Sequence, residues 1–367
     1  MDGGKYFNRI QSGSFQYRCM AAALRVQCGP DWIAQVWRRL GFNIPALDVV
    51  DTHGNRRKRK HTLDSARKVL VKYKRQRLMS KLVPSNQDTS YGVAAAQVDV
   101  TIDELQVLCR EYLPRLVVTE QQQQQLALRT TQQANDPSGE WGKQRKIRIT
   151  ASHFGEVCKR RAEFGPLTVR ILYSSTRETP AMRYGCIKEG IARAAYTEYL
   201  KSKHHPDATV TMTGLHVDLK DSWLGASPDG LVYDPSADDP LGLLEIKCPF
   251  LARDTSVKDL CQKSSFFLTD TNGTYHLKPK HNYYYQVQGQ LHILWRSWYD
   301  FVVYTPHDSQ TLVIHRIYYD DKFWNEVMYK KLQKFYLSSM LPELCRPRYP
   351  STKKIRPMID IEPILRP

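Results

Sequence analysis

The part of the sequence that most constrains this chain is a turn followed by a short apolar run. Residues 227–233 read Ser-Pro-Asp-Gly-Leu-Val-Tyr, and Asp229 lies in the turn-forming Pro-Asp-Gly. Sixteen residues after Asp229, the run Leu-Leu-Glu-Ile-Lys-Cys-Pro at 243–249 carries Glu245 and Lys247. A short hydrophobic run ended by a proline is typical of a buried strand. Side chains alternate along a strand, so we expect Glu245 and Lys247 to point to one side and the residue between them to point into the core.

These residues would gather two carboxylates and an ammonium on one side of a hairpin. Carboxylate oxygens on a rigid strand suit Mg²⁺, which takes oxygen ligands and keeps several water molecules. A lysine beside the ion can orient or deprotonate an attacking water, or stabilise charge on a phosphate. Taken singly, a Pro-Asp-Gly is most often a plain turn and a Glu-x-Lys a solvated cross-strand pair. The apolar neighbours of Glu245 argue against a solvated face, so the set favours phosphodiester hydrolysis.

The length and composition of the chain limit the classes of protein to which it can belong. A chain of 367 residues supports roughly two domains with a sizeable core. Apolar runs stay well short of the roughly 18 residues that span a bilayer, so we expect an intracellular protein with no membrane partner. The net charge of +17 favours a polyanionic partner, most commonly nucleic acid. Eight scattered cysteines without a Cys-x-x-Cys indicate neither a zinc module nor a disulfide framework.

Composition divides the chain into four segments. A glutamine run at 120–125 and a polar stretch at 130–139 are typical of a linker. The Pro- and Lys-rich end of the chain is typical of a loosely held tail. We therefore expect a basic, mainly helical domain over 1–118, a Gln-rich linker over 119–138, a second domain over 139–345 and a basic Pro-rich tail over 346–367.

The first domain is notable for its basic residues. Apolar spacing predicts a small helix over 31–40 and another helix over 101–113. Between them, residues 56–81 are strongly basic. The run at 56–60 is a candidate nuclear-import signal, and the whole stretch is a candidate arm that grips phosphates. A solvated helix face is the third explanation.

In the second domain, residues with hydroxyl side chains lie at the start of one predicted helix, and residues with amide side chains lie along one face of another. Thr150 or Ser152 is a candidate N-cap, and a helix start with free amide groups binds phosphate readily, with Arg145 close by. A long helix over 181–200 carries Glu189 among small residues that permit close approach of other backbone. A later helix over 281–294 places Gln286 and Gln290 on one face, where they can orient ligands, touch DNA backbone or satisfy buried hydrogen bonds.

Alternation and periodicity predict the remaining elements. We expect strands over 209–219, 223–227, 299–304 and 311–318, an irregular insertion after residue 249, and an amphipathic helix over 321–339.

Several motifs occur together in the order of a known family. They are Trp141-x-x-x-Arg145 with Ile149-Thr-Ala-Ser152, Gly185-x-x-x-Glu189, Ser227-Pro-Asp229-Gly, Glu245-Ile-Lys247-Cys-Pro and Tyr283-x-x-Gln286-x-Gln288. The segment 139–345 resembles the YqaJ-like viral recombinase (phage lambda exonuclease) family of the PD-(D/E)XK nuclease superfamily. Its ending, at 298–304 and 341–344, looks like eukaryotic members associated with mobile elements.

The resemblance implies a fold and roles for individual residues. The fold would be α/β (α+β), with a restriction-endonuclease-like mixed central sheet flanked by helices and preceded by the small helical basic domain. Asp229 and Glu245 would bind Mg²⁺ or Mn²⁺, Glu189 would serve a second ion, and Lys247 would act on the water. Gln286 would line the site. The pocket for a 5′ phosphate would consist of Arg145, Thr150, Ser152 and Ser227.

The resemblance also implies an activity. Family members digest linear duplex DNA from 5′ ends, so we expect a Mg²⁺-dependent DNA exonuclease acting on double-stranded ends in recombination, repair or mobile-element processing. A nuclear location would follow from residues 56–60. Phage members form trimeric rings, and the long insertion between Pro249 and Tyr283 is an obstacle to a ring here.

Two alternative functions remain open. The same catalytic core would serve a structure-selective or nicking endonuclease. A domesticated DNA-binding protein without catalysis is the other alternative, and the complete set of Asp229, Glu245 and Lys247 argues against it.

Overall fold

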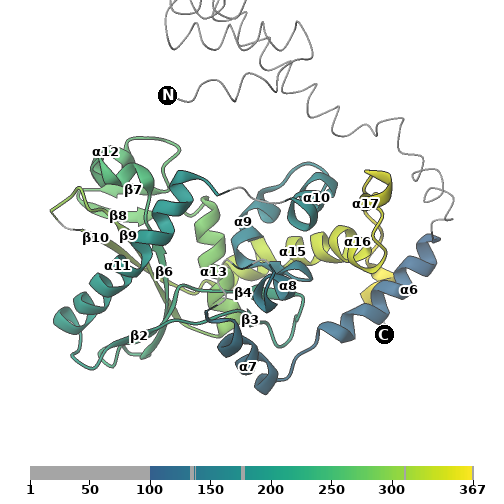
Figure 1. Cartoon of the computed structure of the whole chain (residues 1–367), viewed down its shortest axis with the longest axis horizontal. Helices are drawn as coiled ribbons and strands as arrows, with labels where there is room; N and C mark the ends of the chain where they lie inside the picture. The colour runs from purple at the N-terminus through teal and green to yellow at the C-terminus, as the bar shows by residue number, and fades with distance from the viewer. Residues whose placement is uncertain (1–99, 133–135, 137, 175–177, 310, 366–367) are drawn as a thin grey trace, which may run out of the picture. The chain divides into compact units, whose positions relative to one another are not determined.

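The computed structural model describes residues 100–132, 136, 138–174, 178–309 and 311–365. The chain divides into two compact units, Met1–Gly92 and Val93–Pro367, and every described element belongs to the second (Figure 1). The predicted helix over 31–40 and the basic stretch over 56–81 lie outside the described residues.

The second unit has a mixed α/β fold. The α-helices are α6 (Ile102–Tyr112), α7 (Glu120–Thr130), α8 (Glu140–Lys146), α9 (Ala151–Lys159), α10 (Gly165–Tyr173), α11 (Pro180–Lys203), α12 (Val257–Cys261), α13 (Asn282–Leu294), α14 (Asp321–Phe323), α15 (Lys330–Phe335), α16 (Leu341–Cys345), α17 (Tyr349–Thr352) and α18 (Glu362–Leu365). Short 3₁₀ turns are η1 (Leu113–Leu116) and η2 (Phe250–Arg253), and π-helical turns are η3 (Trp324–Tyr329) and η4 (Tyr336–Met340). The strands are β1 (Ile149–Thr150), β2 (Thr209–Thr211), β3 (His216–Val217), β4 (Leu224–Ala226), β5 (Gly230–Tyr233), β6 (Leu241–Lys247), β7 (Leu268–Thr271), β8 (Thr274–Leu277), β9 (Trp298–Tyr304) and β10 (Leu312–Tyr318).

The main sheet has five strands in the order β10-β9-β6-β5-β2. Strand β6 is its centre, antiparallel to β5 and parallel to β9, which confirms the predicted mixed sheet. The expected buried strand is therefore present, and both of its neighbours belong to the same sheet.

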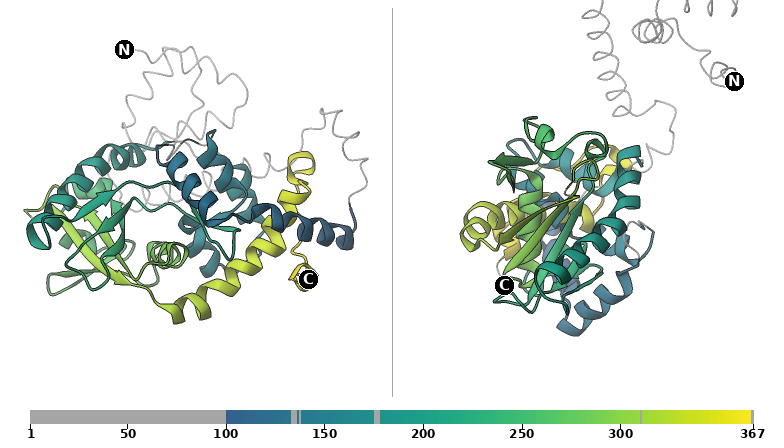
Figure 2. Two further views of the ribbon diagram at one scale, coloured as in Figure 1. Left: turned by 90° about the horizontal axis from the view of Figure 1, so that it is seen from below. Right: turned by 90° about the vertical axis from the view of Figure 1, so that its left-hand side faces the viewer.

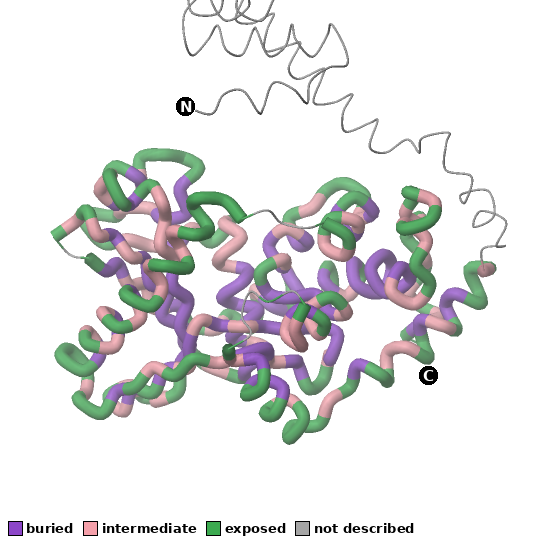
Figure 3. Tube along the Cα trace, in the orientation of Figure 1, coloured by how far each residue is buried: buried purple, intermediate pink, exposed green. Residues whose placement is uncertain are grey.

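Helices cover both faces of this sheet (Figure 2). On one face, Leu244 and Ile246 pack with Ala192 and Tyr196 of α11. On the other face, Leu243 and aromatic residues of β9 pack with apolar residues of α13. Figure 3 shows the buried segments running through the middle of the unit, between helices with exposed outer surfaces. Alternate residues of β6 thus enter two different apolar layers, because successive side chains point to opposite faces.

A smaller three-stranded sheet, in the order β1-β4-β3, stands beside the main one. The strand expected over 209–219 is divided between the two sheets: β2 joins the five-stranded sheet and β3 the three-stranded sheet. Gly214 lies between them, and a Cβ there would collide with Thr130 and the backbone of α7. The close approach of α7 explains why this position requires glycine.

The Gln-rich segment 119–138 differs from the expected linker. Thr119 and Gln122 form a capping box that begins α7. Gln123 Nε2 then donates to the carbonyl of Val217 (2.5 Å), and Thr130 Oγ1 accepts from the amide of Leu215 (2.8 Å). Two of the polar side chains thus tie α7 to β3 and the residues before it.

The C-terminal tail 346–367 also differs from expectation over its described part, which is packed rather than loosely held. The amide of Ile359 donates to the carbonyl of Ser338 (3.1 Å), and Gln106 Nε2 donates to the carbonyl of Asp360 (3.1 Å). Ile364 is buried in the main core. Helix α6 corresponds to the helix predicted over 101–113, and Thr101 is its N-cap. These contacts join it to the end of the chain.

The insertion after β6 is more regular than expected. Residues 250–277 form η2, α12 and the β7–β8 hairpin. The amide of Leu277 donates to His315 Nδ1 (3.0 Å), and the amide of Val257 donates to Asp308 Oδ2 (2.9 Å). These bonds fix the insertion to β10 and to the turn before it.

The predicted helix over 321–339 lies within the continuous helical segment 321–345, which includes two π-helical turns. None of the described helices is long and apolar enough to cross a membrane.

Candidate active site

The two predicted carboxylates lie opposite each other, with Glu245 on β6 and Asp229 immediately before β5. Gly230 pairs with Leu244, and the amide of Asp229 donates to the carbonyl of Leu244 (3.0 Å), so Asp229 stands across from Glu245. Asp229 Oδ2 also accepts from the amide of Ile246 (2.7 Å). The carboxylate of Asp229 is thereby fixed against β6 beside Glu245.

The carboxylate of Glu245 is buried and has donors on both oxygens. Its side chain is 3% exposed. Oε1 accepts from Lys247 Nζ and from Gln286 Nε2 (2.5 Å). Oε2 accepts from Tyr299 Oη (3.1 Å) and Gln290 Nε2 (3.3 Å). This dense set of donors compensates the cost of burying the charge.

Lys247 lies on the same side of β6 as Glu245, as strand alternation predicts. Its ammonium pairs with Glu245 Oε1 and lies 4.8 Å from the centre of the Tyr283 ring. Tyr283 and Gln286 both come from the first turns of α13, which His281 caps by accepting from the amide of Tyr283 (3.2 Å). The start of α13 therefore sets the position of two groups around the strand.

Glu189, which the resemblance assigns to a second ion, comes from a helix and not from the strands of the main sheet. It lies on α11, and its Oε1 pairs with Arg193 Nη2 (2.5 Å). Its charge contributes to a raised pKa of Asp229, which is about 8 and is due first to burial and then to Glu245. Within the described part of the chain, no three carboxylate, imidazole or thiolate groups form a metal-binding cluster.

The pair Asp229 and Glu245 nevertheless fits a divalent cation. Two adjacent carboxylates repel each other, and the raised pKa of Asp229 reflects that repulsion together with burial. A hard cation accepts carboxylate oxygens and completes its coordination with water. Asp229 and Glu245 would hold Mg²⁺, and Glu189 would act from the edge of the site.

The residues expected to bind a phosphate also come together. Arg145 Nη2 donates to Ser152 Oγ (3.3 Å), and Ser152 Oγ lies 3.3 Å from Thr150 Oγ1. The Arg145 guanidinium stands 4.2 Å from the centre of the Trp141 ring, and Trp141 Nε1 donates to Ser227 Oγ (3.2 Å). Residues from α8, β1, α9 and the turn after β4 thus meet at one place.

This cluster is electropositive. Burial lowers the pKa of Arg145 to about 10, and the pKa of His153 is lowered to about 4 by burial and by the nearby charge of Arg145. The guanidinium contacts a hydroxyl and an indole ring, both of which are neutral. A phosphate would supply the negative charge that these partners lack.

The chain links the cluster to the carboxylates directly. Ser227 directly follows β4 of the three-stranded sheet, and Asp229, two residues later, directly precedes β5 of the five-stranded sheet. Thr150 and Gly225 are partners in the parallel pairing of β1 with β4, so the hydroxyl cluster stands beside that turn. The Ser-Pro-Asp sequence therefore joins the electropositive cluster to the carboxylate pair.

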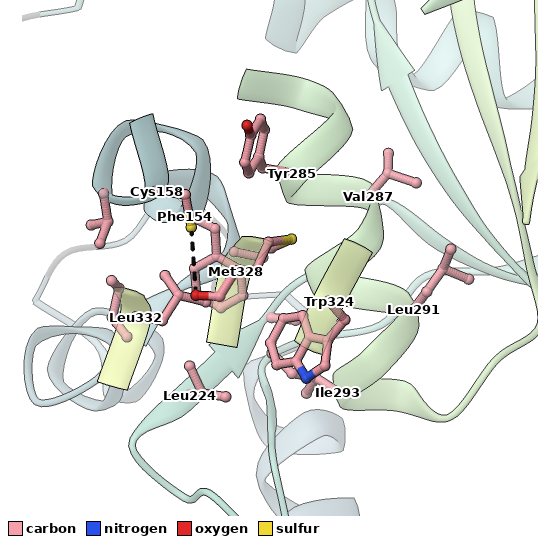
Figure 4. Packing of buried hydrophobic residues seen from close by; sticks show 14 of the residues in the cluster. Phe154, Cys158, Leu224, Tyr285, Val287, Leu291, Ile293, Trp324, Met328 and Leu332 are labelled. Atoms are coloured by element: carbon pink, nitrogen blue, oxygen red, sulfur yellow. Dashed lines mark hydrogen bonds between the residues drawn. The ribbon is translucent and has the colours of Figure 1, made fainter. Parts of the chain in front are cut away.

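Helices α9 and α13 reinforce this link by packing closely. A Cβ at Gly155 would overlap Asn282, and a Cβ at Gly289 would overlap the ring of Phe154. Figure 4 shows Phe154 and Cys158 of α9 beside Met328 and Leu332, with α13 alongside. This shared core holds the helix that bears Ser152 against the helix that bears Gln286.

Sequence reasoning missed Tyr299 as a site residue and treated Gln290 only as a helix-face residue. The spacing of Gln286 and Gln290 by four positions did signal a common face. Tyr299 gave no signal, since its position depends on β9 pairing with β6 in the register that sets Leu243 opposite Tyr299.

A comparison with models of protein families finds one match over this region, to the YqaJ-like viral recombinase domain at residues 140–296. This agrees with the resemblance stated from the motifs, and it spans α8 through α13, the elements that carry the predicted site residues.

Solved structures similar to the chain include two of LHK-Exo. The complex of LHK-Exo with dAMP is 26% identical, covers 58% of this chain and 97% of its own, and has a TM-score of 0.43. The alkaline exonuclease LHK-Exo from Laribacter hongkongensis is 28% identical over 53% of this chain and 89% of its own, with a TM-score of 0.40. The Shutoff and Exonuclease Protein of Kaposi's sarcoma-associated herpesvirus is 14% identical over 71% of this chain and 76% of its own, with a TM-score of 0.38. No curated protein matches the chain.

Proposed function

We propose that this protein is a Mg²⁺-dependent DNA exonuclease that hydrolyses phosphodiester bonds of linear duplex DNA from 5′ ends. Its role would lie in recombination, repair or mobile-element processing. The YqaJ-like domain and the arrangement of Asp229, Glu245 and Lys247 support a nuclease.

The observation that carries the proposal is the junction at Ser227-Pro-Asp229. An electropositive cluster with hydroxyl groups lies on one side of this turn and a buried carboxylate pair lies on the other. An enzyme that removes nucleotides from a 5′ end needs both a grip on the terminal phosphate and a hydrolytic centre nearby. Arg145, Thr150, Ser152 and Ser227 would supply the grip.

Each side chain has a role in hydrolysis. When bound by Asp229 and Glu245, Mg²⁺ would supply Lewis acidity at the phosphate and a more acidic water. Lys247 would hold the attacking water or a phosphate oxygen, and Gln286 would keep Glu245 in place. The water oxygen bonds to phosphorus and loses a proton to solvent, the bond to the leaving sugar oxygen breaks, and that oxygen takes up a proton from solvent.

The proposal is tested by digesting linear duplexes that carry either a 5′ phosphate or a 5′ hydroxyl, with Mg²⁺ or with EDTA. We expect faster digestion of the phosphorylated end and none in EDTA. Arg145→Ala should reduce the preference for phosphate by about 10- to 100-fold, as expected when a charge-assisted hydrogen bond of about 1.5–3 kcal/mol is lost. The matched control is Lys143→Ala, an exposed cation on the same helix, which should keep the preference.

Covalently closed circles distinguish the alternatives. Resistance of circles supports the exonuclease, whereas their cleavage would indicate an endonuclease. Equal digestion of both ends by the unaltered protein would remove the proposed role of Arg145. Absence of cleavage with Mg²⁺ or Mn²⁺ would favour a non-catalytic DNA-binding protein.

A further inference from the structure

Two neutral residues that have no role in the proposed hydrolysis lie next to the Glu245 carboxylate. Tyr299 of β9 and Gln290 of α13 both donate to Glu245 Oε2, at 3.1 and 3.3 Å. They are also bonded to each other, because Tyr299 Oη lies within hydrogen-bonding distance of Gln290 Oε1. Both side chains are enclosed, at 0% and 1% exposed.

The two oxygens of Glu245 have different surroundings. Oε1 accepts from Lys247, whose side chain is 22% exposed, and from Gln286, which retains some exposure. Oε2 accepts only from groups that are fully enclosed in the core. Oε1 therefore lies on the side that solvent can reach, and Oε2 lies on the inner side.

The position of Tyr299 gives it little freedom. Its strand pairs in parallel with β6, with Leu243 opposite Tyr299, so the ring lies on the same face as Glu245. The hydroxyl carries a single hydrogen, and three acceptors share it: Gln290 Oε1, Glu245 Oε2 and the carbonyl of Leu244 (3.1 Å). A phenylalanine would fill the same space and would leave Glu245 Oε2 with Gln290 as its single donor.

We propose that Tyr299 and Gln290 are positioning residues that hold Glu245 Oε2 in the core and so direct Oε1 towards the cation and Lys247. This inference rests on the proposed metal-dependent hydrolysis. A carboxylate with a fixed orientation binds a cation without first losing rotational freedom, and partners that orient a metal ligand typically contribute 10- to 100-fold in affinity or activity.

The test is cation binding by the full chain without DNA, measured with Mn²⁺ by electron paramagnetic resonance and with Mg²⁺ by calorimetry. We expect Tyr299→Phe to weaken binding by about 10- to 100-fold. At saturating cation, the KM for DNA should stay unchanged because Tyr299 does not face the substrate. Gln290→Met is the second variant, for use if Tyr299→Phe does not fold, and should weaken binding in the same direction.

The matched control is Tyr196→Phe. Tyr196 is also a fully buried phenol that donates to a carboxylate, Asp300 Oδ2 (2.5 Å), but it lies on the opposite face of the sheet. We expect this variant to lose stability and to keep its cation affinity. Weaker cation binding in Tyr299→Phe, together with unchanged binding in Tyr196→Phe, supports the inference.

Two results would contradict the positioning role, and only the second would also contradict the proposed nuclease function. If Tyr299→Phe and Gln290→Met bind Mn²⁺ as the unaltered protein does, while Asp229→Asn loses binding, the positioning role is wrong and the proposed nuclease stands. If the unaltered protein binds neither cation and digests no DNA, both the positioning role and the proposed function are wrong.

Discussion

At the scale of single residues, the charge state of Lys247 selects among the roles that the sequence allowed. Burial by itself lowers the pKa of a lysine, yet the charges of Glu245 and Asp229 raise the pKa of Lys247 above its ordinary value. The side chain is therefore an ammonium at neutral pH. An ammonium cannot take a proton from water, so Lys247 would orient the water or stabilise charge on the phosphate.

We expect Lys247→Met to reduce the rate of the chemical step by about 10²–10³-fold, the loss typical of removing one group that stabilises a transition state. Methionine keeps the length of the side chain and removes its charge. Single-turnover digestion of a 5′-phosphorylated duplex measures the effect, and DNA affinity in EDTA serves as the reference. A variant with full activity would show that Lys247 only compensates the charge of Glu245.

At the scale of elements, the close packing of α9 and α13 brings the two halves of the site together. Gly155 and Gly289 allow the helices to approach until a Cβ would overlap Asn282 or Phe154. Phe154 is fully buried and also packs against Trp324, so its ring has little room to move. The contact therefore tolerates no added volume.

Gly289→Ala should destabilise the protein by about 1–3 kcal/mol, because the added methyl overpacks the Phe154 ring. Urea denaturation measures the change. Gly185→Ala is the matched control: it lies within α11, where a Cβ meets nothing within 4 Å, so alanine should stabilise by up to about 1 kcal/mol. Equal stability of the two variants would contradict the close contact.

Gly185 and Gly190 also correct an expectation. The small residues of the helix over 181–200 were expected to permit close approach of other backbone, and at these two glycines a Cβ would meet nothing. Ala192, by contrast, is buried against the main sheet.

At the scale of the whole molecule, folding keeps several histidines neutral. Burial lowers the pKa of His153, His216, His292 and His315 to about 4. In the unfolded chain a histidine titrates near 6.5. Below about pH 6.5 the unfolded state therefore binds more protons at these positions than the folded state, and these groups contribute less stability as the pH falls towards 4.

We expect the free energy of unfolding to depend less steeply on pH when one of these histidines is removed. His216→Gln can keep a hydrogen bond to Thr213 while it removes the titrating group. Between pH 6 and 5 its slope should be lower by up to about 1.4 kcal/mol per pH unit than that of the unaltered protein. Urea denaturation at several pH values measures the slope, and parallel curves would contradict a buried neutral His216.

The parts of the candidate site that depend on local sequence patterns could be predicted from the sequence. Strand alternation puts Glu245 and Lys247 on one side, the Pro-Asp-Gly turn puts Asp229 before β5, and the four-residue spacing puts Gln286 and Gln290 on one helix face. The same local rules predicted the helix that the structure shows as α6 and the buried strand β6. They failed for α7, where a glutamine run looked like a linker, because Leu126 of this helix is buried with Leu215 and Val217, which lie far away along the chain.

The sequence by itself determined which groups are available, since the identity and spacing of side chains along a strand or a helix need no knowledge of the rest of the chain. Only the tertiary structure decided which elements meet: β9 beside β6, which brings Tyr299 to Glu245, and α9 against α13, which brings the hydroxyl cluster to the carboxylates. It also decided that Glu189 pairs with Arg193. Strand pairing across more than 50 residues depends on how both sheet faces are buried, and that choice is made by the packing of the whole unit.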